Sequence, residues 1–272
     1  MKLELPTSET ERPAEFVEAF ARGLSVLEAF DAYHSEMTLS DIARRTGLPP
    51  AAVRRSLITL KTLGYVGQVG KRYYLRPRVL GIGSAFYFSA RVDEVFLPEL
   101  RALVETFGDA SSVATLYGQD VLYVAHYSVQ RARRAAAHVG ARYPAFATSL
   151  GRVLLAGLSE ERLDTWMSEL NPVPLTNRTV TDKSELRRII QQVRQQGYAT
   201  TVDELDYGVT ALAVPIRAPD GTTVAALNTS GYTVLTTPEK LVTERLPELR
   251  AAAQRIAIAL SRNPVIFSML AP

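Results

Sequence analysis

Two adjacent arginines, Arg54 and Arg55, are the residues of this sequence whose chemistry points most directly to another molecule. A guanidinium group can hydrogen-bond O6 and N7 of one guanine together, whereas the ammonium of Lys61 suits a phosphate. The full set of candidate nucleic-acid contacts is Arg22, Arg54, Arg55, Thr59, Lys61, Lys71 and Arg72. These residue types predict a surface that binds double-stranded DNA. RNA binding through the same surface, or an ordinary solvated basic face, are the alternatives.

The charge distribution favours the DNA interpretation. The 272 residues carry 31 Lys+Arg and 28 Asp+Glu, a net charge of +3. Residues 42–92 hold ten of the basic residues and no Asp or Glu, so the remainder has 21 basic and 28 acidic residues, a balance of −7. One acid-free basic segment in an otherwise acidic chain indicates an anionic partner for that segment.

Helical periodicity and turn signals indicate which elements carry the basic residues. A stripe of apolar residues predicts a helix over 16–30, and it consists of Phe16, Phe20, Leu24, Leu27 and Phe30. Thr38 followed by Asp41 predicts the start of a second helix, and Gly47 its end. Pro49-Pro50 can open a third helix, whose predicted inner face is Val53, Leu57, Leu60 and Leu63.

Two short strands, 65–69 and 72–75, follow the helices and meet at Gly70-Lys71. A helix, a glycine turn, a second helix and a hairpin follow one another in a winged helix-turn-helix. The second helix of the pair, here the one that begins at Pro49-Pro50, enters the major groove. Arg54, Arg55, Thr59 and Lys61 would then face outward. The wing tip, Lys71-Arg72, would meet phosphates or the minor groove.

The rest of the chain changes character near Gly108. Helices are predicted over 78–91, 92–107, 150–170, 183–196 and 239–261, and strands over 111–117, 121–127, 134–139, 199–202, 212–216 and 223–230. The pattern predicts an α+β chain with a mobile arm (1–15), a winged helix-turn-helix (16–77), a linker helix (78–91) and a mixed α/β domain (92–272).

Composition and motifs argue against an enzyme, a cofactor or a metal. The chain has no cysteine, and His34, His126 and His138 lack the spacing of metal ligands. No Gly-x-Ser-x-Gly motif is present, and Gly81-Ile82-Gly83 lacks the third glycine of a dinucleotide fingerprint. The acidic group at 203–206 could bind a divalent cation, although a polar loop explains it more simply. The polar start and the absence of an apolar run of ~18 residues lead us to expect a cytoplasmic protein without a membrane partner.

Several linked motifs resemble the IclR family of bacterial transcription regulators. The segments ARGLSVLEAF, LSDIARRTGLPPAAVRRSLITLKTLGYV and KRYYLRPRVLGIG are similar to its DNA-binding domain and linker helix. The segments YPAFATSLGRVLLA, QQGYATTVDELDYGVTALAVPI and VAALNTSG are similar to its effector domain. The combination of RRSLITL and ATSLGR is most similar to the branch that regulates protocatechuate and p-hydroxybenzoate catabolism.

The resemblance implies a GAF-like domain that holds a small carboxylate effector in a cup. The backbone of Ser149 and Leu150 at a helix start would receive the carboxylate, since exposed amides favour anions there. The residues implied to line the cup are Thr201, Ala211, Asn228 and Ser230, with Arg134 and His138 as further candidates. Thr201 and Ala211 are less polar than the residues of members that bind very small acids. An aromatic acid such as p-hydroxybenzoate or protocatechuate, or a ring-cleavage product, is therefore expected.

The expected function is an effector-responsive, DNA-binding regulator of an aromatic-acid catabolic operon, acting as a homodimer or homotetramer. Specific sites normally require two half-sites, which favours at least a dimer. One alternative is an enzyme or sensor built on the GAF-like domain, with the helix pair serving only for dimerisation. Another is a DNA-binding regulator whose effector pocket is degenerate. Binding of the acid is expected to shift the effector domain between two arrangements. The linker helices would convert that shift into a changed spacing of the two recognition helices.

Overall fold

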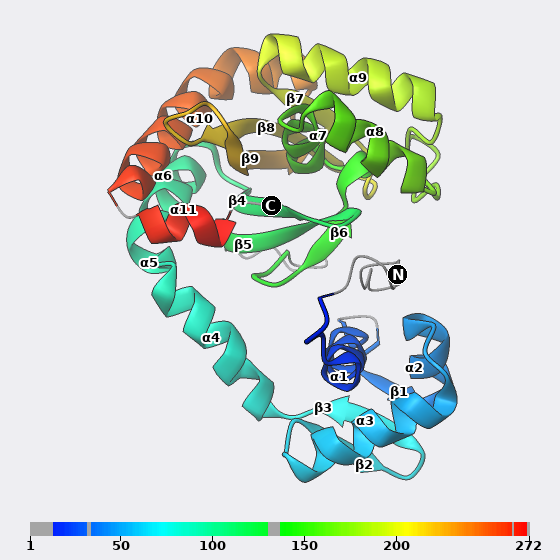
Figure 1. The fold of residues 1–272 in the computed structure, drawn as a ribbon. Helices are drawn as coiled ribbons and strands as arrows, with labels where there is room; N and C mark the ends of the chain where they lie inside the picture. The colour runs from blue at the N-terminus through cyan, green and yellow to red at the C-terminus, as the bar shows by residue number, and fades with distance from the viewer. Residues whose placement is uncertain (1–12, 32–33, 130–136, 263, 271–272) are drawn as a thin grey trace. The chain divides into compact units, whose positions relative to one another are not determined.

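The computed structural model describes residues 13–31, 34–129, 137–262 and 264–270. The chain divides into two compact units, Met1–Tyr87 and Phe88–Pro272, whose elements are drawn in Figure 1. The first unit is mainly helical with a small sheet, and the second is a six-stranded sheet with flanking helices. The α+β prediction is confirmed.

The described part of the first unit begins with three helices and a three-stranded antiparallel sheet. The helices are α1 (Glu18–Glu28), α2 (Leu39–Thr46) and α3 (Pro50–Thr62), and the strands are β1 (Glu36–Thr38), β2 (Val66–Val69) and β3 (Arg72–Leu75), in the order β1-β3-β2. A capping box opens α2, because Thr38 and Asp41 accept hydrogen bonds from each other's backbone amides. Gly47, with φ 70°, ends α2 in the left-handed conformation that glycine adopts without strain. The predicted helix-turn-helix and hairpin are thus present, and β1 is an additional strand.

The core of this unit corrects two predicted helix faces. Ile42, Val53 and Leu57 are buried as expected. The stripe predicted over 16–30 is only partly correct, because Phe30 is buried, whereas Phe20 is 67% and Leu24 40% exposed. The helix instead buries Ala21, Ser25 and Val26. These small side chains permit close packing of α1. Leu63 follows the last turn of α3 as its C-cap and is 47% exposed, so it does not extend the buried stripe.

A series of short helices follows the hairpin. The predicted linker helix consists of a 3₁₀ turn, η2 (Pro77–Val79), followed by α4 (Leu80–Ser89), and α5 (Val92–Val95) and α6 (Leu97–Phe107) come next. No residue of α4 is buried, and Leu80, Ile82 and Phe88 are 73%, 56% and 73% exposed. A helix that is apolar on all sides is normally covered by other protein surface.

The second unit is built on an antiparallel sheet in the order β6-β5-β4-β9-β8-β7. The strands are β4 (Ala110–Tyr117), β5 (Asp120–Ser128), β6 (Arg142–Pro144), β7 (Ala199–Val202), β8 (Val209–Arg217) and β9 (Thr223–Tyr232). The later helical elements are η3 (Ala145–Ala147), α7 (Ser149–Ala156), α8 (Glu160–Glu169), α9 (Lys183–Gln196), α10 (Pro238–Ser261) and α11 (Pro264–Leu270).

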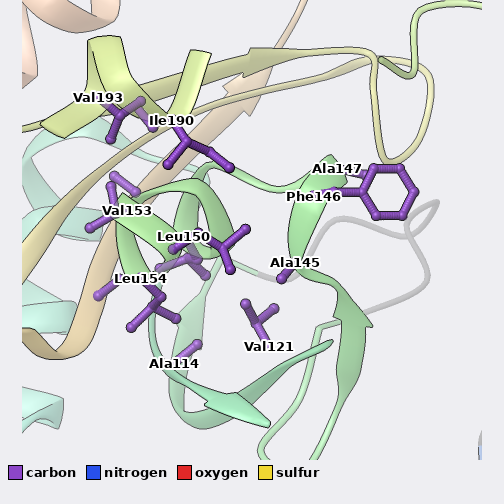
Figure 2. Packing of buried hydrophobic residues seen from close by; sticks show 14 of the residues in the cluster. Ala114, Val121, Ala145, Phe146, Ala147, Leu150, Val153, Leu154, Ile190 and Val193 are labelled. Carbon is purple, nitrogen blue, oxygen red and sulfur yellow. The ribbon is translucent and has the colours of Figure 1, made fainter. Parts of the chain in front are cut away.

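The two faces of the sheet pack against different helices. On one face, Ala114 and Val121 of the sheet join Leu150 and Val153 of α7 and Ile190 of α9 in a single apolar cluster, seen at close range in Figure 2. On the other face lie α6 and α10. For example, Arg101 of α6 stacks over Tyr127 with 5.4 Å from its Cζ to the ring centroid, and Arg245 Nη1 of α10 donates to Thr229 Oγ1 at 3.0 Å.

Several predicted bounds in this unit need correction. The helix predicted over 150–170 is two helices, because α7 ends at Ala156 with Gly157 as its C-cap. A Cβ atom at Gly157 would lie 2.5 Å from Thr223. Of the strand predicted over 134–139, residues 134–136 lie outside the described residues, and 137–139 are not a strand. The short strand β6 and the helix α11 were not predicted. Both are only a few residues long, too short for a clear period.

Candidate functional site

The outer face of α3 carries the two arginines singled out from the sequence. Burial of Val53 and Leu57 fixes the rotation of the helix, which leaves Arg54 and Arg55 exposed. Within the described residues, neither guanidinium group forms a hydrogen bond or ion pair. A nearby polar contact is made by Thr59, whose hydroxyl donates to Arg55 O at 3.2 Å. Two unpaired cations on one exposed helix face are suited to a polyanion.

The other basic candidates lie on the wing and on α1. Lys61 Nζ at the end of α3 donates to Gln68 Oε1 of β2 at 2.9 Å, which connects the recognition helix to the wing. Lys71 and Arg72 are exposed at the hairpin tip, and Arg72 Nη1 is 3.7 Å from Glu36 Oε1. Arg22 is held on α1 by Glu18, with 2.9 Å between Nη2 and Oε1.

In the second unit, strand register places four of the predicted effector residues on one sheet face. Thr201 of β7 is paired with Ala211 of β8, which is paired with Ser230 of β9. Asn228, two residues before Ser230, is paired with Ala213. Directly paired residues of antiparallel strands share a face. Since Ala213 belongs to the apolar cluster around α7 and α9, this is the face toward α7.

The same sheet face contains two further polar residues, Ser112 and His126, which the sequence did not identify as effector contacts. Ser112 is paired with both Asn228 and His126. The Ser112 hydroxyl lies 2.9 Å from His126 Nδ1. Asn228 is 7% exposed, and its Oδ1 has no hydrogen-bond partner. A buried acceptor without a donor carries a desolvation cost of about 1–3 kcal/mol that a bound donor would remove. The sequence offers no local signal for this placement, because Ser112 follows Ser111, which lies on the opposite face of the strand.

The start of α7 provides backbone donors near this face. The Thr148 side chain caps the helix by accepting from Gly151 N at 3.0 Å. Ser149 and Leu150 are buried, and no acceptor within the described residues takes up their amides. A Cβ atom on Gly151 would lie 2.1 Å from Ala145 O, so the helix start is pressed against the preceding turn. Free amides combined with the helix dipole form an anion site.

Of the two remaining candidate effector contacts, Arg134 and His138, the structure describes only His138. Arg134 lies outside the described residues. His138 belongs to a segment that runs beside β5, where Gly140 N donates to Tyr123 O at 2.8 Å. It is near enough to His126 to lower the pKa of that residue.

The acidic group at 203–206 is engaged in hydrogen bonds and ion pairs. Asp203 Oδ1 accepts from Gly208 N and from the Thr233 hydroxyl, both at 2.7 Å. Glu204 forms an ion pair with Arg152. The polar-loop interpretation therefore accounts for these two carboxylates. The described residues contain no group of three or more His, Cys, Asp or Glu arranged to hold a metal.

The environment of His126 predicts a pH dependence of stability. Burial, and secondarily His138, lowers the pKa of His126 from its ordinary 6.5, so the folded state resists protonation. The unfolded state then binds more protons between the lowered pKa and 6.5, and stability falls as the pH drops through that window. We expect urea unfolding, followed by the fluorescence of Trp166 in the second unit, to show lower stability at pH ~5.5 than at pH ~7.5. His126→Gln should reduce this difference, and an unchanged difference would contradict the assignment.

A winged helix-turn-helix joined to a separate α/β unit defines a DNA-binding regulator. The model of the IclR helix-turn-helix domain matches residues 19–70, and that of the bacterial transcriptional regulator IclR C-terminal domain matches residues 87–258. The chain belongs to the IclR family of bacterial transcriptional regulators. The expectation of a regulator, not an enzyme, is thereby confirmed.

Individual relatives cover most of the chain. It is 38% identical to the Pca regulon regulatory protein of Pseudomonas putida, over 88% of this chain and 83% of that protein. It is 34% identical to the p-hydroxybenzoate hydroxylase transcriptional activator of Acinetobacter baylyi, over 92% and 94%. A similar solved structure is an IclR homologue from Microbacterium hydrocarbonoxydans complexed with 4-hydroxybenzoate, with 28% identity, TM-score 0.72 and coverage of 90% and 100%. No helix in the described part of this chain is long and apolar enough to span a bilayer.

Proposed function

We propose that this regulator responds to a small aromatic carboxylate. The acid would bind in the second unit, between the start of α7 and the polar residues on the sheet face toward α7, namely Ser112, His126, Asn228 and Ser230. Two features carry the proposal. Among the described residues, the buried amides of Ser149 and Leu150 at the start of α7 have no acceptor, and the buried Oδ1 of Asn228, on the sheet face toward α7, has no donor. The amides suit a carboxylate, and the acceptor suits a polar group on the ring. The proposed effector residues are Ser149, Leu150, Thr201, Ala211, Asn228, Ser230 and His138, joined by Ser112 and His126.

The chemistry of the relatives supports an aromatic acid. One similar structure holds 4-hydroxybenzoate, and two relatives are named for the pca regulon and for p-hydroxybenzoate hydroxylase. Ala211 and Ala213 supply small apolar surface on the same sheet face, against which a ring could pack. The candidates are p-hydroxybenzoate, protocatechuate and a ring-cleavage product, and the regulated operon would encode their catabolism.

We further propose that operator DNA is bound by a homodimer or homotetramer in the cytoplasm. Residues 16–77 would form the DNA-binding domain, 78–91 the linker and 92–272 the effector domain. Arg54 and Arg55 would contact bases, and Arg22, Thr59, Lys61, Lys71 and Arg72 would assist in positioning the duplex. The exposed apolar surface of α4 supports self-association, because two copies of this helix could cover each other.

Thermal-shift screening of the pure protein against aromatic acids and their ring-cleavage products tests the proposed effector. A ligand at a hundred times its Kd stabilises the folded state by about 2.7 kcal/mol. We expect at least one of the candidate acids to raise the Tm by several degrees, and Asn228→Ala to diminish that rise. If none of these acids shifted the Tm, the proposed effector class would be wrong.

A further inference from the structure

Among the described residues of the second unit, the most completely buried ion pair joins α7 to the loop after β7. Arg152 Nη1 and Nη2 donate to Glu204 Oε1 and Oε2 at 2.7 and 2.6 Å. The two side chains are 3% and 9% exposed. Arg152 Nε also donates to Phe146 O at 3.2 Å, in the turn that precedes α7. The guanidinium group therefore connects three segments at once.

Both partners lie close in sequence to the proposed effector contacts. Arg152 is one turn from Ser149, and side chains of a helix point back toward its start. Glu204 follows β7, which carries Thr201. The Glu204 carboxylate also accepts from Val180 N at 3.3 Å, and its carbonyl accepts from the Thr179 hydroxyl at 2.7 Å. A further loop is thus connected to the same pair.

Stability alone is a weak explanation for such a pair. Removing two charges from water costs free energy that their attraction seldom exceeds, and apolar replacements of similar volume are often as stable. What a two-pronged Arg–carboxylate contact does provide is fixed geometry, since two parallel hydrogen bonds set both distance and orientation. The geometry fixed here is that of the free amides of α7 relative to β7.

We infer that Arg152 and Glu204 are positioning residues of the effector site, and that they set the affinity for the effector carboxylate by holding the start of α7 against the loop after β7. The inference rests on the proposed effector site. Neither residue needs to touch the effector, because their action is exerted through the amides of Ser149 and Leu150.

Two conservative substitutions separate positioning from charge. Arg152→Lys retains the cation but loses the two-pronged contact. Glu204→Gln removes a negative charge and, by Coulomb's law alone, would tighten binding of an anion. Isothermal titration calorimetry with 4-hydroxybenzoate should instead show both substitutions weakening the affinity about tenfold or more, comparable to the loss of one charge-assisted hydrogen bond. Tighter binding by Glu204→Gln would overturn the inference.

Urea unfolding, measured alongside effector affinity, distinguishes positioning from a merely structural role. A further variant, the double substitution Arg152→Met/Glu204→Leu, should remain about as stable as the parent chain yet bind the acid weakly. Arg194→Lys is the matched control, because Arg194 bonds Ala156 O and Leu158 O at the opposite end of α7. It should lose stability without losing affinity. Variants whose affinity equals that of the parent would refute the inference alone, whereas a parent chain that binds none of the candidate acids would refute the proposed function with it.

Discussion

Replacement of both Arg54 and Arg55 by alanine is expected to lower operator affinity by about a thousandfold or more. A good two-pronged contact with a base contributes about 1–3 kcal/mol, and two such residues in each half-site of a dimer make a thousandfold loss, about 4 kcal/mol, a conservative expectation. Both side chains are exposed on α3. Their removal should therefore leave the fold and effector binding unchanged. Fluorescence anisotropy with an operator duplex at fixed salt measures the effect.

A control variant removes the same number of positive charges from a different surface. Arg162 and Arg188 are exposed on α8 and α9 of the second unit, and their double alanine variant loses two cations without altering α3. DNA affinity should be nearly unchanged in this control. A similar loss in both variants would mean that total charge, and not the face of α3, determines binding. If the Arg54/Arg55 variant also lost effector binding, misfolding would be the explanation.

Acidic substitutions on α4 are expected to have the second largest effect. Leu80→Glu combined with Ile82→Glu places two charges on a helix whose apolar residues are exposed in the single chain. If two copies of α4 cover each other, these charges would be buried without partners, and the dimer should dissociate. Operator affinity should then fall by about a hundredfold, because the half-sites no longer bind as one linked unit.

Sedimentation velocity at micromolar concentration measures the oligomeric state of this variant directly. Val173→Glu is a suitable control, because Val173 is 59% exposed and lies in the second unit. The control should remain a dimer or tetramer. A Leu80/Ile82 variant that stayed associated would show that α4 is not the interface. In that case the operator affinity of the variant should also resemble that of the parent chain.

Much of the fold could be predicted because local signals agreed with the tertiary structure. The capping box at Thr38, the turn at Gly47 and the hairpin at Gly70-Lys71 are local features, and each is present. The rotation of α1 could not be predicted from its apolar stripe. Phe20 and Leu24 of that stripe are exposed, while Ala21 and Ser25 pack inward. Which face is buried depends on the space left by α3, which no local pattern encodes.

The candidate site shows the same division. Alternation along β9 correctly placed Asn228 and Ser230 on one face. Ser112 and His126 were missed as members of that face, because their pairing joins strands distant from β9 in sequence. The Arg152–Glu204 pair spans 52 positions. Such contacts depend on sheet order, and sheet order is set by long-range packing.

Reciprocal linkage between effector and operator tests the central claim most directly. The affinity for a duplex selected from a random pool should be measured by anisotropy with and without saturating 4-hydroxybenzoate. The affinity for 4-hydroxybenzoate should then be measured with and without the duplex. A regulator of this kind should show the same coupling factor in both titrations, about 5- to 150-fold. Two affinities that do not depend on each other would contradict the account.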